Sequence, residues 1–168
     1  MTKVRGFELV SKYVGKELTL PERATVASAG YDLAAAENML IPSIWTLIKK
    51  EDINREEMPV QLSKLVPTGV KAYMPESEYL MLVNRSSNPL KNNLAIPNGI
   101  GIIDSDYYDN PANEGEIFVQ LINYGLDDYE IKKGDRIAQG IFTPYYTVDK
   151  EQNNFDKRLG GFGSTGKS

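Results

Sequence analysis

Short runs of β-forming residues, separated by turn residues, recur along most of this chain, and long segments with helical periodicity are almost absent. Turn signals at Pro67-Thr-Gly69, Pro97-Asn-Gly99 and Lys133-Gly-Asp135 punctuate these runs. The pattern predicts an all-β fold, either a sandwich or a jelly roll. A short helical turn is the alternative at Ala34–Asn38. The expected strands are Phe7–Val10, Tyr31–Ala35, Leu40–Ile48, Leu65–Tyr73, Leu80–Asn84, Ile117–Asn123 and Ile137–Pro144.

The length of 168 residues is enough for one domain with a sizeable core, which we expect to span residues 1–148. A polar stretch of mixed charge at residues 49–64 is expected to be a solvated loop, and the alternative is an insertion that binds a partner protein. Residues 149–168 are polar and then glycine-rich. We therefore expect them to form a flexible C-terminal arm.

The net charge of −4 and the pI of about 5.0 predict no broad basic surface. Nucleic acids and membranes are therefore not expected as partners, and an anionic substrate would need a local cluster of basic groups. The first residues show no signal-peptide pattern, and no apolar run approaches 18 residues. These features predict a cytoplasmic protein.

The chain contains no cysteine and no histidine. This excludes disulfides, thiolate or imidazole zinc sites, and catalysis by Cys-His or Ser-His-Asp groups. The chemistry that remains uses carboxylates, hydroxyls, lysine, arginine and Mg²⁺ bound through oxygen.

Asp104 follows an apolar, glycine-containing run that begins at Asn98. Such a run is typical of a buried strand or hairpin, and Gly99 and Gly101 permit a sharp turn or a close approach of the backbone. A carboxylate at the end of a rigid element suits a general base. The alternative is an ordinary hairpin in which Asp104 caps a turn.

Arg85, Ser86 and Ser87 follow another expected strand. A planar guanidinium beside two hydroxyls is a compact set of donors for phosphate, and the alternative is a solvated arginine on a turn. A second phosphate-binding candidate is the glycine-rich stretch from Gly160 to Gly166, whose amides could form an anion nest. It is not a P-loop, and the alternative is a flexible tail.

Segments of this kind, in this order and spacing, closely resemble the five motifs of the homotrimeric dUTP diphosphatases (dUTPases), and the resemblance covers nearly the whole chain. They are Ala29-Gly-Tyr-Asp-Leu33, Asn84-Arg-Ser-Ser-Asn88, Gly101-Ile-Ile-Asp-Ser-Asp-Tyr107, Gly134-Asp-Arg-Ile-Ala-Gln139 and Arg158-Leu-Gly-Gly-Phe-Gly-Ser-Thr-Gly166. The resemblance implies a jelly-roll-like β-barrel with a flexible arm, a homotrimer with shared active sites, and hydrolysis of dUTP to dUMP and pyrophosphate. It also implies Mg²⁺, bound mainly through the triphosphate and water.

The resemblance implies roles for the residues that would handle the base, the sugar and the water. Asp104 would orient and activate the water that attacks the α-phosphate. Asn98, Gly101 and Ile103 would belong to a hairpin that reads uracil through backbone groups. Tyr107 would lie under the deoxyribose and exclude a 2′-hydroxyl. The stretch from Asp109 to Glu114 is longer than the usual turn, which we interpret as an elaborated loop.

Other residues would hold the triphosphate. Arg85, Ser86 and Ser87 would contact it, and Gln139 would help, unless that side chain is a solvated amide at a strand end. Asp32 would lie near the metal, bonded to Arg136, or form a purely structural ion pair.

The arm would fold over the nucleotide of a neighbouring subunit. Phe162 would stack on uracil, with Gly163 beside it, and Ser164, Thr165 and Arg158 would engage the γ-phosphate. The sequence Arg158-Leu-Gly-Gly-Phe162 is one residue shorter than the usual pattern, so Lys157 could share the role of Arg158.

Two other functions stay open on the sequence. A dCTP deaminase shares this fold, but it needs a catalytic glutamate where this chain has Gln120. The third possibility is a regulatory module, similar to phage-type dUTPases that bind a repressor, with residues 49–64 as the candidate surface.

Overall fold

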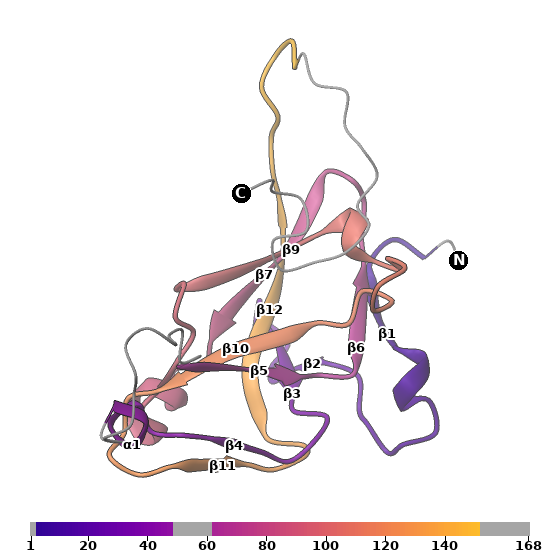
Figure 1. Ribbon diagram of the computed structural model, residues 1–168. Coiled ribbons are helices and arrows are strands. Elements are labelled where there is room, and N and C mark those ends of the chain that lie inside the picture. The colour runs from indigo at the N-terminus through magenta and orange to yellow at the C-terminus, as the bar shows by residue number, and fades with distance from the viewer. Residues whose placement is uncertain (1–2, 49–61, 152–168) are drawn as a thin grey trace.

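The computed structural model describes residues 3–48 and 62–151. These residues form short strands joined by tight turns, with little helix (Figure 1). The strands are β1 (Gly6–Leu9), β2 (Glu22–Arg23), β3 (Tyr31–Ala34), β4 (Met39–Ile41), β5 (Ser63–Pro67), β6 (Val70–Tyr73), β7 (Glu78–Asn84), β8 (Leu94–Ala95), β9 (Ile100–Asp104), β10 (Phe118–Asn123), β11 (Tyr129–Ile131) and β12 (Arg136–Pro144). The helical segments are η1 (Ser11–Tyr13), α1 (Ile44–Ile48), η3 (Asn88–Asn92) and η4 (Ser105–Tyr107).

The largest sheet described has five strands in the order β2-β3-β12-β7-β9, and its neighbours all pair antiparallel. A three-stranded sheet, β5-β10-β8, lies across it, and the pairs β1-β6 and β4-β11 complete the fold (Figure 1). The apolar core lies between these layers and combines Leu33 and Leu80 from the large sheet with Val66, Val119 and Leu121 from β5 and β10. This is the expected all-β fold, a jelly roll.

The predicted strand from Leu40 to Ile48 is wrong in its second half, where the structure has helix α1. Pro42 lacks a backbone N–H and follows the last residue of β4. The hydroxyl of Ser43 then accepts a hydrogen bond from the backbone N–H of Trp45 at 3.1 Å, as an N-cap does. The predicted strand from Leu65 to Tyr73 is divided into β5 and β6 by a turn at Gly69, whose φ is +70°.

Strand β9 is an edge strand, so of the two structures expected from its apolar sequence, a buried strand or a hairpin, the buried strand is wrong. It pairs with β7, and its Ile100 and Ile102 side chains are 45% and 48% exposed in the single chain. The alternative of a helical turn at Ala34–Asn38 is also wrong, because β3 continues to Ala34 and the next four residues form an irregular connection, in which Ala35 and Ala36 are buried. Strands β2, β8 and β11 were not predicted, because two or three residues carry too little periodicity to detect.

Candidate active site

Asp32 on β3 is the centre of a polar network between three neighbouring strands. Its carboxylate accepts hydrogen bonds from Arg85 Nε at 3.1 Å, Arg136 Nη1 at 3.0 Å and Gln139 Nε2 at 3.2 Å. Asp32 and Gln139 stand opposite each other in the β3–β12 ladder, so both side chains lie on the same face of the sheet. Gly30 permits this closeness, because a Cβ at that position would lie 3.1 Å from the Gln139 side chain.

The network carries an excess of positive charge. The Asp32 side chain is 9% exposed and forms ion pairs with both Arg85 and Arg136, so two guanidiniums meet one carboxylate. A guanidinium has five N–H donors, and these ion pairs use only some of them. The remaining donors are held in fixed positions, which is an arrangement suited to a polyanionic ligand.

Arg85, Ser86 and Ser87, which we call the phosphate clamp, form a turn after the last residue of β7. The turn is closed by a hydrogen bond from the backbone N–H of Asn88 to the carbonyl of Arg85, at 3.0 Å. Ser86 is exposed and Ser87 is half-buried. The clamp therefore presents hydroxyls beside a guanidinium that Asp32 holds in place.

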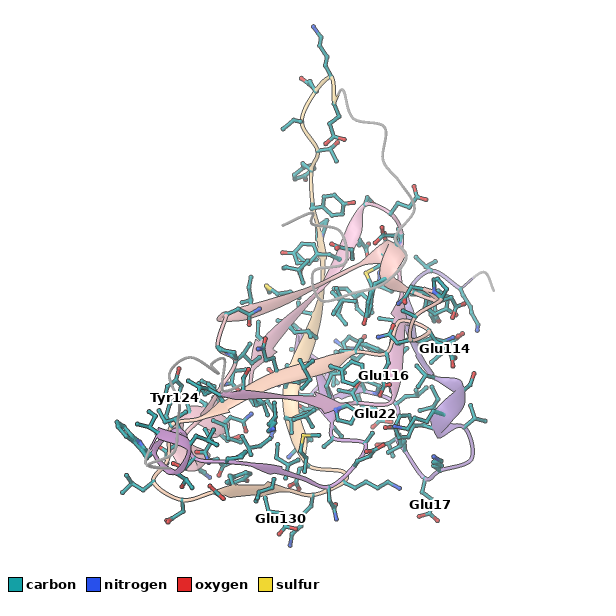
Figure 2. The ribbon with its side chains drawn as sticks, in the orientation of Figure 1. Glu17, Glu22, Glu114, Glu116, Tyr124 and Glu130 are labelled. Carbon is teal, nitrogen blue, oxygen red and sulfur yellow. The ribbon has the colours of Figure 1, made fainter. Side chains whose placement is uncertain are left out.

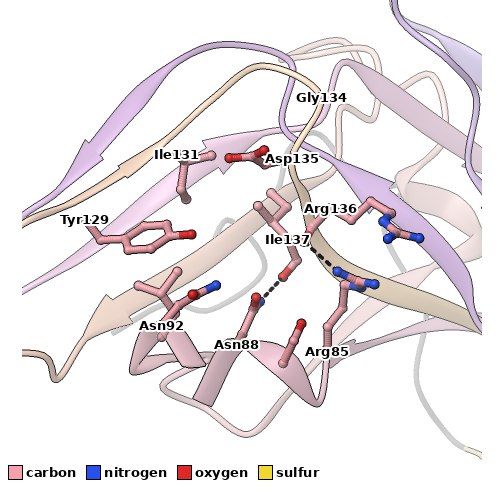
Figure 3. Close-up of a pocket in the computed structure, with 11 residues that line it drawn as sticks. Arg85, Asn88, Asn92, Tyr129, Ile131, Gly134, Asp135, Arg136 and Ile137 are labelled. Carbon is pink, nitrogen blue, oxygen red and sulfur yellow. Dashed lines mark hydrogen bonds between the residues drawn. The ribbon is translucent and has the colours of Figure 1, made fainter. Parts of the chain in front are cut away.

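A cavity of about 300 Å³ opens beside this turn (Figure 3). Arg85, Ser87 and Arg136 line it together with Asn88 and Tyr129. Figure 3 shows that Asn88, Tyr129 and Arg136 come from three different segments of the chain. A second hollow, of about 330 Å³, is also lined by Arg136 and includes Asp32 and Leu20. Arg136 thus borders both hollows.

Asp104 does not join this network within one chain. It ends β9 and stands opposite Tyr79, near the start of β7, whereas the phosphate clamp follows the end of β7. Arg85 is six residues along the chain from Tyr79, a distance of roughly 20 Å at about 3.3 Å per residue of extended strand. Asp104 also precedes η4, and its side chain forms no capping hydrogen bond to that helical turn.

The predicted uracil-reading hairpin is a turn followed by the edge strand. The backbone N–H of Gly99 donates to the carbonyl of Ile96 at 3.0 Å, and Gly99 has a φ of +78°, which favours glycine. Asn98 is exposed, while Gly101 and Ile103 are half-buried. An edge strand presents backbone donors and acceptors on its outer side, as backbone recognition of a base would require.

Tyr107 is 5% exposed, and its hydroxyl is fixed by the loop that follows it. That hydroxyl donates to the carbonyl of Glu116 at 3.0 Å and accepts from Asn113 Nδ2 at 2.7 Å. The Glu116 side chain lies toward β1 and β6 (Figure 2), where Glu116 Oε1 accepts from the backbone N–H of Gly69. Burial raises the pKa of the Glu116 carboxyl above its usual range.

The elaborated loop from Asp109 to Glu114 is thus part of the support of Tyr107. Its other contacts tie it to β6 and η1: Lys71 pairs with Asp109, and Ser11 donates to Glu114 through both its N–H and its hydroxyl. Sequence reasoning did not identify Asn113 or Glu116 as supports, since a lone amide or acid in a loop carries no motif.

Several predicted site residues lie outside the described part of the chain. These are Arg158, Phe162, Gly163, Ser164 and Thr165 of the arm, together with most of the stretch 49–64. In residues 3–48 and 62–151 no three acidic side chains gather as metal ligands. The same ranges hold no helix with the length and apolar character of a membrane span.

A sequence model of the dUTPase family matches residues 16–166. The chain is 43% identical over 165 residues to a deoxyuridine 5′-triphosphate nucleotidohydrolase of Lactococcus lactis subsp. lactis, covering 98% of this chain and 99% of that protein. It is 42% identical to a crystal structure of a dUTPase from Streptococcus mutans, with a TM-score of 0.72, covering 86% of this chain and 98% of the other.

A more distant structural relative shares the fold. It is a mutant of the dUTPase from phage phi11 of S. aureus, 20% identical with a TM-score of 0.65, covering 91% of this chain and 98% of that one. That structure describes the coordination of a structural Mg(II) ion.

Proposed function

The chain belongs to the dUTPase family and hydrolyses dUTP, and from this premise we propose an active site in which Asp104 activates water while the phosphate clamp holds the triphosphate. The observation that carries the proposal is the Asp32 network, which fixes Arg85 and Arg136 beside the hydroxyls of Ser86 and Ser87. Gln139 donates to the same carboxylate and so lies within reach of the same phosphates.

The reaction is an attack of water on the α-phosphate. The water oxygen forms a bond to phosphorus, its proton passes to the Asp104 carboxylate, and the bond to the bridging oxygen of the β-phosphate breaks. The products are dUMP and pyrophosphate. Charge that develops on the leaving pyrophosphate is stabilised by the clamp hydroxyls and by the Arg85 guanidinium, which Asp32 already orients before the reaction.

Mg²⁺ fits this site as an ion held by the substrate. The Asp32 oxygens are engaged by two arginines and Gln139, so this carboxylate would contribute to a metal site only indirectly. The triphosphate oxygens and water supply the hard oxygen ligands that Mg²⁺ prefers. When bound, the ion neutralises negative charge on the phosphates.

The active site is shared between copies of the chain in this proposal. The separation between Asp104 and the phosphate clamp, roughly 20 Å along strand β7 at about 3.3 Å per residue, is too long for one α-phosphate to meet both groups. A closed symmetric oligomer brings the end of β9 in one copy against the clamp of the next. The family resemblance makes that oligomer a trimer, and Ile100 and Ile102 are apolar side chains available for its interface.

Base and sugar recognition are assigned to β9 and Tyr107. The outer edge of β9 from Asn98 to Ile103 would pair with uracil, and the ring of Tyr107 would lie under the deoxyribose. The arm, through Phe162, Gly163, Ser164, Thr165 and Arg158, would close over the nucleotide. A cytoplasmic location and a partner protein for residues 49–64 stay predictions from the sequence.

A pyrophosphate-release screen with dUTP, dTTP, dCTP and UTP, each with and without Mg²⁺, tests the proposed specificity. We expect pyrophosphate from dUTP alone, at a rate that falls when Mg²⁺ is chelated. Equal release from dCTP or UTP would contradict the assigned recognition. Ammonia release from dCTP, measured on the same samples, would instead indicate a deaminase, although Gln120 bonds to Ser63 Oγ and offers no carboxylate.

A further inference from the structure

We infer that Asn88 is a positioning residue, which holds the phosphate clamp in register with strand β12 and so controls binding of the triphosphate part of the nucleotide. The inference rests on the proposed role of the clamp. Asn88 itself is assigned no contact with substrate. It would act by fixing Arg85 and, through the main chain of β12, Arg136.

The Asn88 side chain is 3% exposed and joins two strands. Its Nδ2 donates to Asn84 Oδ1 at 2.9 Å and to the carbonyl of Ile137 at 2.8 Å, the second of which is drawn in Figure 3. Its backbone N–H closes the clamp turn by donating to Arg85. One residue therefore fastens the clamp to the end of β7 and to β12 together.

The backbone carbonyl of Ile137 needs this hydrogen-bond partner because the pairing of β12 with its neighbouring strands is irregular at that residue. The register of β12 against β3 shifts between Arg136 and Ala138, so Ile137 is the extra residue of a bulge. On the other side, β7 ends with Asn84 opposite Ala138, so its ladder stops before Ile137. The amide of Asn88 takes the place of the missing strand partner.

The same bulge sets the position of Arg136. Its carbonyl accepts from Arg85 Nη1 at 3.3 Å, and its guanidinium donates to Asp32. Both arginines of the network thus depend on the path of β12 at residues 136–137. If the bulge shifts by a fraction of an ångström, the donors that face the phosphates shift with it, and a charge-assisted hydrogen bond weakens steeply with misalignment.

The test compares affinities for two ligands, an imido analogue of dUTP that resists hydrolysis and dUMP, by calorimetry on the full chain. Asn88→Ala removes both side-chain bonds, and Asn88→Leu removes them while keeping most of the volume. We expect the Kd of the analogue to rise about tenfold, the scale of one charged hydrogen bond lost. The Kd of dUMP, which lacks the β- and γ-phosphates, should change less than about twofold in the same comparison.

Asn110→Ala is the matched control. Asn110 is a buried amide of similar exposure, and its Nδ2 donates to the Tyr107 carbonyl and to Asn113 Oδ1, away from the clamp. Both ligands carry the deoxyribose that Tyr107 would contact, so any effect through Tyr107 falls on both Kd values. Its loss should lower the unfolding temperature while leaving the ratio of the two Kd values unchanged. An unchanged ratio of Kd values in both Asn88 variants would overturn the inference. Failure of both variants to fold would also overturn it, because Asn88 would then stabilise the fold rather than position the clamp.

The variant Arg85→Ala distinguishes failure of this inference from failure of the proposed role of the phosphate clamp. If Arg85→Ala weakens the analogue and the Asn88 variants do not, only the role of Asn88 fails. If Arg85→Ala leaves the affinity for the analogue unchanged, the assignment of the phosphate clamp fails as well.

Discussion

Asp104 and Arg85 lie at opposite ends of the ladder between β7 and β9. Asp104 stands opposite Tyr79, whereas Arg85 follows Asn84 at the far end of β7 and turns toward Asp32. Within one chain, the candidate base and the candidate phosphate clamp therefore lie at two separate positions. This separation is what an active site built from several copies of one chain requires.

Asp104→Asn tests the assigned base. The amide keeps the shape of the side chain but cannot take a proton from water, so we expect kcat to fall by about 10²–10⁴-fold. The Kd of the imido analogue should stay close to that of the wild type, since the residues assigned to hold the triphosphate are unchanged. Steady-state kinetics and calorimetry on one preparation measure both quantities, and a near-normal kcat would remove Asp104 from the mechanism.

Tyr107→Ala tests the assigned sugar gate. Removal of the ring should lower the preference for dUTP over UTP more than the preference over dCTP, since the ring would exclude a 2′-hydroxyl and takes no part in reading the base. Competition kinetics with these nucleotides measure both preferences. Equal losses against UTP and dCTP would show that Tyr107 does not distinguish sugars.

Tyr107→Phe is the control for that experiment. It keeps the ring but leaves Asn113 Nδ2 and the Glu116 carbonyl without the hydroxyl that joins them. Stability should fall by about 1–3 kcal/mol, the cost of unsatisfied buried polar groups, while discrimination against UTP is retained.

The sequence predicted the parts of this molecule that depend on local pattern. Alternation and turn residues located most of the longer strands, and the motifs located Asp32, Arg85 and Asp104. The stretch from Leu40 to Ile48 was misjudged because a short apolar run fits a strand or a helix equally well, although Pro42 before Ser43 was an available signal.

Other features depend on register between distant strands, which no local pattern reveals. The bulge at Ile137 and its partner Asn88 meet only when β7 and β12 pair. The separation of Asp104 from Arg85 likewise follows from which strand β9 joins. Edge position also explains why Ile100 and Ile102 are exposed despite an apolar sequence.

Glu116→Gln tests the effect of burying a carboxyl. Burial raises the pKa of Glu116 in the folded state above its unfolded value. At a pH between these two pKa values, the folded state therefore binds more protons than the unfolded state. Stability from this group is therefore present below the unfolded pKa and is lost as the pH rises through the folded pKa. Glutamine keeps an acceptor for Gly69 without the charge, so the variant should be more stable than the wild type at neutral pH.

Urea unfolding of both proteins at one chain concentration, from about pH 4 to about pH 8, measures this difference. The stability gained by the variant should shrink toward the acid end of the series. A difference that is the same at every pH would show that charge on Glu116 is not its cause.

The central claim, that each active site combines Asp104 of one copy with the phosphate clamp of another, is tested by mixing two inactive variants. Asp104→Asn and Arg85→Ala subunits, carrying different tags, are refolded together, and oligomers that contain both tags are isolated. In a cyclic trimer with both tags, about a third of the sites receive both groups intact, so the mixture should regain about that share of wild-type dUTP hydrolysis. Mixed oligomers as inactive as either variant alone would place both groups in one chain and contradict the account.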